Sequence, residues 1–117
     1  MIRIVVPMIP PSVNHYVVHT RAGQHFKTKE AESFAQAIAL AAGEYRWKRY
    51  EAKQLSVFVV LGKGQKGDLD NFLKVPIDSL VRCGVIRSDA TIERITITKQ
   101  RGPAPRTEIE VELAPAS

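Results

Sequence analysis

The segment 55-LSVFVVL-61 restricts the fold of this chain more than any other part of the sequence. It is an almost continuous run of β-branched and aromatic residues, which is typical of a strand inside a sheet. Because the run is nearly all apolar, it predicts a central strand that is buried on both faces. A sheet with this strand in its interior is therefore the centre of the fold.

One helix is predicted before that strand in the sequence and a second helix after it. From a Thr28 cap to about Trp47, apolar side chains recur at three- and four-residue steps, which predicts an amphipathic helix. A second helix is predicted over 71–84, with Gly84 at its end. Pro76 lies inside this second segment. It either kinks the helix or belongs to the first turn of a helix that begins later.

The remaining segments predict strands and one long loop. Residues 9–28 contain prolines, a glycine and several basic residues, and predict an irregular loop with a short hairpin around Ala22-Gly23. Further strands are predicted at 2–8, 91–100 and 107–113, the last two half-buried. The order β-α-β-α-β-β predicts an α/β (α+β) fold, a single small domain over 1–117 with a mixed sheet flanked by two helices.

Composition narrows the class of protein. The sequence contains no apolar run of about 18 residues, so we expect no membrane span, and its first residues predict a strand rather than a signal peptide. The single Cys83 excludes an internal disulfide, which fits the cytoplasm. Lys and Arg number 17 against 12 acids, giving a net charge of +5. This balance suits a nucleic-acid-binding protein, although a merely basic surface gives the same count.

An acidic cluster stands out in this basic chain. Asp68, Asp70, Asp78 and Asp89 are four of the 12 acids and fall within 22 residues. One interpretation is structural: aspartates favour helix starts, and Asp70, Lys74 and Asp78, spaced four apart, would form surface salt bridges on one helix face. The functional interpretation is a metal site made of carboxylate oxygens, which Mg²⁺ or Mn²⁺ prefers.

The position of Asp89 decides between these interpretations. If the strand after Asp89 pairs beside 55–61, we expect Asp89 to reach the same end of the sheet as Asp68. Three converging carboxylates could then hold one or two hard cations, which activate water and neutralise charge on a phosphodiester. A neighbouring lysine would add positive charge without being a ligand.

The motif residues resemble the RusA family of Holliday junction resolvases. The resemblance rests on 68-DLDNFLK-74, the continuation 77-IDSL-80, Gly84, Asp89 before a strand, and the early segment 10-PPSVNHY-16. It covers essentially the whole chain and implies a homodimeric, magnesium-dependent endonuclease that nicks four-way DNA junctions symmetrically, in recombination and repair. A two-fold dimer would present one site to each of two opposed strands.

The resemblance also implies roles for particular residues. Asp68, Asp70 and Asp89 match the catalytic and metal-binding acids, and Lys74 matches the essential lysine. Family members often carry two adjacent acids where this chain has Ser88 and Asp89. Asp78 is expected to support the site rather than to bind the metal. DNA contacts are expected from Asn14, Arg21, Lys27, Lys63, Lys66, Asn71, Lys99 and Arg101.

Two other features have open interpretations. Trp47, within the basic segment 46-RWKR-49, either stacks on a DNA base or packs at the end of the first helix. Glu108, Glu110 and Glu112 alternate with apolar residues, which predicts an acidic outer strand face away from bound DNA.

We therefore expect a Mg²⁺-dependent Holliday junction endonuclease, with Mn²⁺ as an alternative cofactor, in the cytoplasm of a bacterial or phage-infected cell. The alternatives are a non-catalytic DNA-binding protein on the same fold and a nuclease that acts on other branched or flap DNA. A junction-cleavage assay separates the three.

Overall fold

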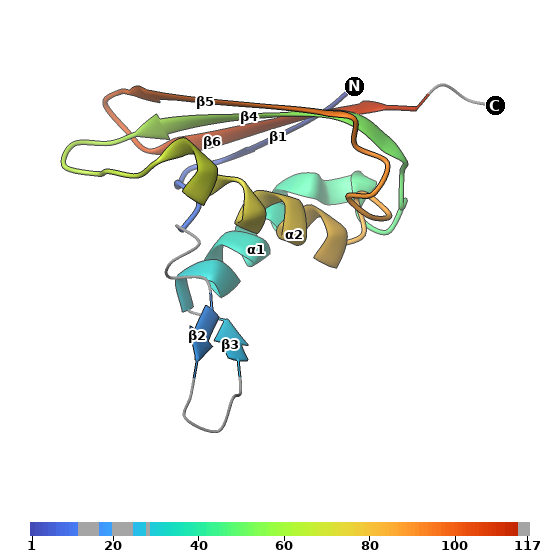
Figure 1. Ribbon diagram of the computed structural model, residues 1–117, viewed down its shortest axis with the longest axis horizontal. Helices are drawn as coiled ribbons and strands as arrows, with labels where there is room; N and C mark the ends of the chain where they lie inside the picture. Colours follow the sequence, from blue (N-terminus) through green and yellow to red (C-terminus); the bar gives the residue numbers. More distant parts are fainter. Residues whose placement is uncertain (12–16, 20–24, 28, 115–117) are drawn as a thin grey trace.

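A mixed four-stranded sheet forms one layer of the molecule, and two helices form the other (Figure 1). The computed structural model describes residues 1–11, 17–19, 25–27 and 29–114, with 17–19 and 25–27 described by their backbone alone. Across the sheet the strands are β1 (Ile2–Val6), β6 (Arg106–Leu113), β4 (Ala52–Leu61) and β5 (Arg94–Arg101). The helices are α1 (Lys29–Ala42) and α2 (Lys74–Arg82). The predicted α+β fold, with a mixed sheet and two helices, is confirmed.

β4 is an interior strand, as predicted, but it is not buried on both faces. Leu55, Val57 and Val59 are buried beneath the helices. On the opposite face Gln54 is exposed and Phe58 is half-buried, since both described helices of eight or more residues lie on one side of the sheet (Figure 1). Buried and exposed side chains therefore alternate along β4, as expected for a sheet with one open face.

β4 and β5 form the parallel pair of the sheet, with Leu55 opposite Ile95 and Leu61 opposite Arg101. Parallel neighbours need a crossover connection. The chain makes this connection through α2, which follows β4 and precedes β5 in the sequence and runs back along the sheet. β5 lies at the sheet edge, so nearly all of its residues are exposed. The prediction of a half-buried strand here is wrong, because within the described sheet β5 is paired on one side only.

The first helix ends earlier than predicted. α1 stops at Ala42, and a short 3₁₀ turn, η2 (Gly43–Tyr45), follows it. Gly43 has φ +52°, a left-handed conformation that glycine adopts readily and that commonly terminates helices. Trp47 therefore lies beyond the helix, in the segment that connects α1 to β4.

The second helical segment is divided in two. A 3₁₀ helix, η3 (Leu69–Phe72), comes first, and α2 follows from Lys74. Pro76 is thus in the first turn of α2, where a missing backbone donor costs nothing, and this confirms the second of the two alternatives for Pro76. At the other end, Val85 N donates to Leu80 O at 3.0 Å and Gly84 N to Val81 O at 3.1 Å. With Gly84 at φ +76°, these bonds make a Schellman cap that ends the helix as predicted.

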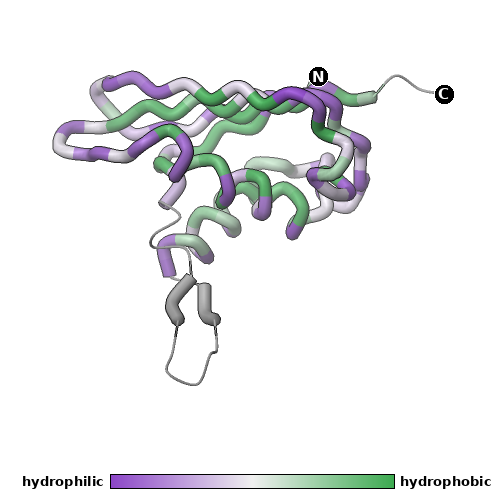
Figure 2. The backbone as a smooth tube through the Cα atoms, viewed as in Figure 1, coloured by the Kyte–Doolittle hydropathy of each residue, from purple (hydrophilic) through white to green (hydrophobic). Residues whose placement is uncertain are grey.

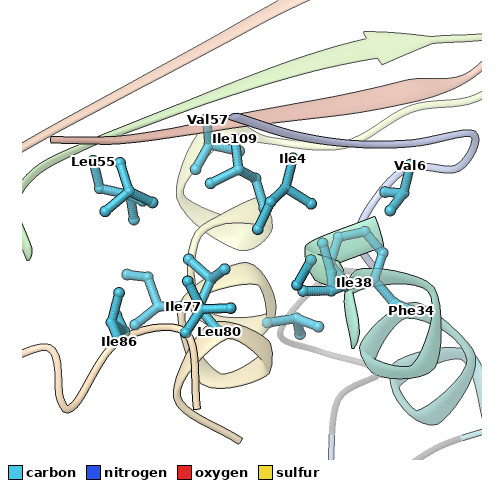
Figure 3. Close-up of a cluster of buried hydrophobic side chains, with 14 of the residues drawn as sticks. Ile4, Val6, Phe34, Ile38, Leu55, Val57, Ile77, Leu80, Ile86 and Ile109 are labelled. Atoms are coloured by element: carbon cyan, nitrogen blue, oxygen red, sulfur yellow. The ribbon is translucent and has the colours of Figure 1, made fainter. Parts of the chain in front are cut away.

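The core lies between the helix layer and the covered face of the sheet (Figure 3). Phe34 and Ile38 of α1 and Leu80 of α2 are fully buried there. They meet side chains from β1, β4 and β6, including Ile4, Leu55 and Ile109. Hydrophilic residues gather instead along the loop from β4 towards α2 (Figure 2). Asp68 and Asp70 lie at the end of that loop and in the 3₁₀ turn after it, Asp78 lies on α2, and Asp89 lies in the turn before β5.

The predicted hairpin in the early loop is confirmed. β2 (Val17–His19) and β3 (His25–Lys27) pair antiparallel, with Val18 opposite Phe26. They form a separate two-stranded sheet that extends from the helix layer (Figure 1). None of the helices in the described part of the chain is long and apolar enough to cross a membrane.

Candidate active site

The loop of residues 62–67 leads from the end of β4 to the aspartate motif and is fastened to β5. Arg101 donates from Nη1 to Gly62 O at 2.6 Å and from Nη2 to Gln65 O at 2.8 Å. Lys99 Nζ donates to Gly67 O at 2.8 Å. Two cations expected to bind DNA are thus engaged with the backbone just before Asp68, and their hydrogen bonds fix the entry to the motif.

Gly67 allows a close approach at the same place. A Cβ on residue 67 would lie 1.9 Å from Phe72 Cζ, well inside any real contact distance. Phe72 is buried beneath the loop and anchors η3 to the core. The loop therefore packs tightly against η3 at Phe72, on either side of Asp68 in the sequence.

Asp68 and Asp70 are exposed and do not cap a helix. Asp68 occupies the N-cap position of η3, yet its side chain makes no capping hydrogen bond to any described amide. Leu73 holds that position for α2, again with no side-chain cap among the described residues. The capping interpretation of the motif therefore fails. Two carboxylates are presented to solvent with no helix-capping role.

Lys74 and Asp78 lie one turn apart on the exposed side of α2. Lys74 Nζ is 3.6 Å from Asp78 Oδ2, and the lysine side chain is 60% exposed. A hollow of about 230 Å³ is lined by Asp70, Leu73, Lys74, Ile77, Asp78 and Asp89. It brings three carboxylates and one ammonium group to a single concave surface. Asp68 is outside this set, and Asp78 is inside it.

Asp89 reaches the hollow by a different route from the one expected. In the parallel β4–β5 pair, Asp89 precedes β5 and Asp68 follows β4, so the two lie at opposite ends of these strands. The expectation that they share one end of the sheet is wrong, because it did not include the return of α2 along the sheet.

The turn that carries Asp89 is fastened to the start of β4. Thr91 Oγ1 donates to Ala52 O at 2.7 Å, and Glu93 N donates to Lys53 O at 2.8 Å. Within the turn, Ser88 Oγ accepts a hydrogen bond from Ala90 N at 2.9 Å. These bonds fix the turn, and Asp89 lines the same two hollows as Asp78. Ser88 stabilises the turn through the hydrogen bond from Ala90 N.

The hollow suits a hard cation such as Mg²⁺, because Asp70, Asp78 and Asp89 line it with carboxylate oxygens. Within the described residues, however, no three His, Cys, Asp or Glu side chains are close enough together to hold one ion. Asp70, Asp78 and Asp89 share a surface without forming a closed ligand cage.

Arg82 is a site residue that the sequence interpretation missed. It continues the four-residue spacing of Lys74 and Asp78, and this spacing is the signal that could have found it. With Asp78, Val81, Ser88 and Asp89 it lines a second hollow of about 340 Å³. Its Nη1 donates to Glu32 Oε1 of α1 at 2.9 Å, which orients the guanidinium across the helix pair.

The other residues expected to bind DNA are scattered. Lys63 and Lys66 are exposed on the 62–67 loop, and Asn71 is half-buried in η3. Lys66 also lines an apolar hollow beside Phe72 and the start of α1. Asn14 and Arg21 lie outside the described residues, and Lys27 is described only by its backbone.

The acidic face of β6 lies on the open side of the sheet, away from the helices. Arg3 and Arg106 both donate to Glu108, the latter from Nε to Oε2 at 2.9 Å. The hydrogen bond from Arg3 is the main cause that lowers the pKa of Glu108. This face is thus partly neutralised by its own arginines and is separate from the candidate site.

Comparison with known families agrees with the motif. The family model described as Endodeoxyribonuclease RusA matches residues 7–112. The chain belongs to the RusA family. The match begins just after β1, runs to the penultimate residue of β6 and includes every residue that lines the carboxylate hollow. The RusA family is a family of DNA-cutting enzymes, and the recognition based on the aspartate motif is confirmed. No match was found among curated proteins.

Proposed function

We propose that this chain is a metal-dependent endonuclease that cuts four-way DNA junctions by paired symmetric nicks. Membership of the RusA family over residues 7–112 carries the proposal. The grouping of Asp70, Asp78 and Asp89 around Lys74 supports it. The net charge of +5 is favourable for a polyanionic substrate.

We further propose that Asp70 and Asp89, which line the same hollow, would hold Mg²⁺, or Mn²⁺ in its place, and that Asp68, two residues before Asp70, would reach the cation from outside the hollow. The exposure of Asp68 and Asp70 and their lack of a capping role support this assignment. When bound, such a cation neutralises phosphoryl oxygens and activates water. Asp78 orients the Lys74 ammonium across 3.6 Å, and Lys74 supplies positive charge to the phosphate.

The experiment is cleavage of a labelled four-way junction by wild type, Asp70→Asn and Glu112→Gln. With Mg²⁺ we expect paired nicks from wild type, and junction binding without cutting from Asp70→Asn. Glu112→Gln is the matched control, because Glu112 is an exposed carboxylate on the strand face opposite the site. It should cut like wild type.

Two outcomes would contradict parts of the proposal. A wild-type protein that binds the junction but never cuts it with Mg²⁺ or Mn²⁺ is a non-catalytic DNA-binding protein. If the protein cuts flaps or linear duplex as well as junctions, the proposed nuclease activity stands, but the proposed selectivity for junctions is contradicted.

A further inference from the structure

Trp47 is the largest side chain exposed near the candidate site. It is 60% exposed, so Trp47 packs against the protein only in part. One part of its ring lies against Gly84, where an added Cβ would meet Trp47 Cε3 at 2.5 Å. The ring is therefore supported from beneath by the end of α2 and open to solvent above.

The backbone holds this ring in an unusual conformation. Trp47 has φ +66° and Arg49 has φ +52°. Both values lie in the left-handed backbone region, which residues other than glycine rarely adopt. Hydrogen bonds to the α2 cap maintain it, from Trp47 N to Cys83 O at 3.1 Å and from Arg49 N to Gly84 O at 2.8 Å. Strained backbone that is fixed in this way is common where a protein positions a group for binding.

The neighbours of Trp47 are cationic. Arg46, Lys48 and Arg49 are all exposed. An exposed aromatic ring between basic side chains is the combination that binds single-stranded nucleic acid, since the ring stacks on a base and the cations contact phosphates. The charge of this segment therefore favours a nucleotide over an apolar protein partner.

Trp47 is also connected to the carboxylates. With Arg46, Ser79, Arg82 and Cys83 it lines a hollow of about 290 Å³ between α1 and α2. Arg82 is shared with the hollow that contains Asp78 and Asp89. From Lys74 to Cys83, whose carbonyl accepts the hydrogen bond from Trp47 N, the helix and its cap rise about 14 Å, at roughly 1.5 Å per residue. A stacked strand advances about 3.4 Å per nucleotide, so this distance is at most about four nucleotides.

We propose that Trp47 stacks on a base of the cleaved strand at the point of strand exchange, within about four nucleotides of the phosphate at the carboxylate hollow, while Arg46, Lys48 and Arg49 bind the adjoining phosphates. This inference rests on the proposed function, because it assumes that the hollow binds a DNA strand. It gives a reason for preferring branched DNA, since stacking is interrupted where strands exchange, whereas every interior base of a continuous duplex is stacked on both faces.

The direct test uses the fluorescence of wild type. Trp47 is the single tryptophan of the chain. When tryptophan is excited selectively, the fluorescence emission therefore reports on this site alone. In EDTA, which prevents cutting, we expect a four-way junction to quench the emission strongly and a blunt duplex of the same sequence to quench it little. A junction that binds in a gel-shift assay and leaves the emission unchanged overturns the proposal.

Variants provide a second, independent test. Trp47→Ala should bind the junction about fivefold or more weakly, with unchanged affinity for duplex, and Trp47→Phe should restore binding to within about twofold. Leu40→Ala is the control, since Leu40 is an equally apolar side chain that is 80% exposed. Equal junction affinity of Trp47→Ala and wild type overturns the stacking role.

The two proposals fail separately. Quenching without any cleavage in Mg²⁺ removes the nuclease function and retains the base-stacking site. Cleavage with unquenched Trp47 removes the stacking site and retains the nuclease. With 2-aminopurine at successive positions of the cut strand, the strongest quenching should lie within about four nucleotides of the nick, and a more distant maximum contradicts the proposal.

Discussion

Lys74 and Asp78 form the part of the candidate site that the structure defines most directly. The two side chains project from successive turns of α2, and their charged atoms are 3.6 Å apart. An exposed ion pair of this kind contributes little to stability, so its value lies in where it holds the ammonium group. Asp78, expected only to support the site, is a lining residue of the hollow, whereas Asp68 is not.

Replacing Lys74 by alanine should therefore affect cleavage far more than folding. We expect single-turnover cutting to fall by roughly 10²- to 10³-fold, because one preorganised positive charge is lost at the phosphate. The melting temperature should stay close to that of wild type. Lys29→Ala, which removes an exposed lysine at the start of α1 outside the hollow, is the control, and an equal loss in both variants would contradict a specific role for Lys74.

Glu108 predicts a dependence of stability on pH. Its pKa lies below the ordinary value of 4.5, first because Arg3 donates a hydrogen bond to its carboxylate. The folded state thus holds the proton less tightly than the unfolded state. Ionised Glu108 therefore stabilises the folded state fully when the pH is above the ordinary pKa of 4.5. This stabilisation is lost as the pH falls through the lowered pKa of the folded state. Urea unfolding should show Glu108→Gln less stable than wild type at pH 7 and nearly equal to it once wild-type Glu108 is protonated. A difference that persists in acid would be inconsistent with this assignment.

At the scale of elements, β5 acts as a clamp for the loop that carries the motif. Arg101 and Lys99 point to the covered side of the sheet and together make three hydrogen bonds to the backbone of residues 62–67. The alternating geometry of the strand places Thr98 on the other side, opposite Phe58 of β4. The sequence suggested phosphate contacts for these cations, because it does not reveal which backbone carbonyls lie nearby.

Arg101→Ala should loosen the loop without unfolding the protein. Loss of about 1 kcal/mol from the local hydrogen bonds would make amides in 63–67 exchange about fivefold faster. Hydrogen exchange followed by mass spectrometry measures this, and junction cleavage should weaken in parallel. Thr98→Ala is the matched control on the same strand. Similar exchange in both variants would show that Arg101 does not hold the loop.

At the scale of the whole molecule, two surfaces have different characters. The helix side carries the carboxylate hollow and the basic, aromatic segment around Trp47. The open sheet face carries the glutamates of β6, among which Glu108 is paired with arginines. A chain of 13.0 kDa has limited surface for both DNA and a partner. We expect the second copy to leave the helix side free, since both sites of a dimer must reach the junction.

The proposed homodimer predicts a mass in solution of twice the 13.0 kDa of the chain. Light scattering after size exclusion at micromolar concentration measures it directly. The reason for two copies is the approximate two-fold symmetry of the junction, which presents opposed strands to identical sites. A species of 13.0 kDa alone, with or without junction DNA, would argue against paired nicking by a dimer.

Most of the fold could be predicted, because its signals are local. The apolar run at 55–61, the periodicity of α1 and the glycine after α2 each act over a few residues. The errors came from context. Gly43 ended α1 early, and the open sheet face and the edge position of β5 removed burial that the apolar pattern suggested.

The sequence by itself determined the order of the elements, the family motif and the supply of carboxylates beside a lysine. Only the tertiary structure decided which of them meet. The parallel pairing of β4 and β5 separates Asp68 from Asp89, while α2 brings Asp70, Asp78 and Asp89 to one hollow. It also joins Arg82 and Trp47 to that surface. The physical reason is that strand pairing and helix return connect residues far apart in the chain, and such contacts leave no periodic signal in the sequence.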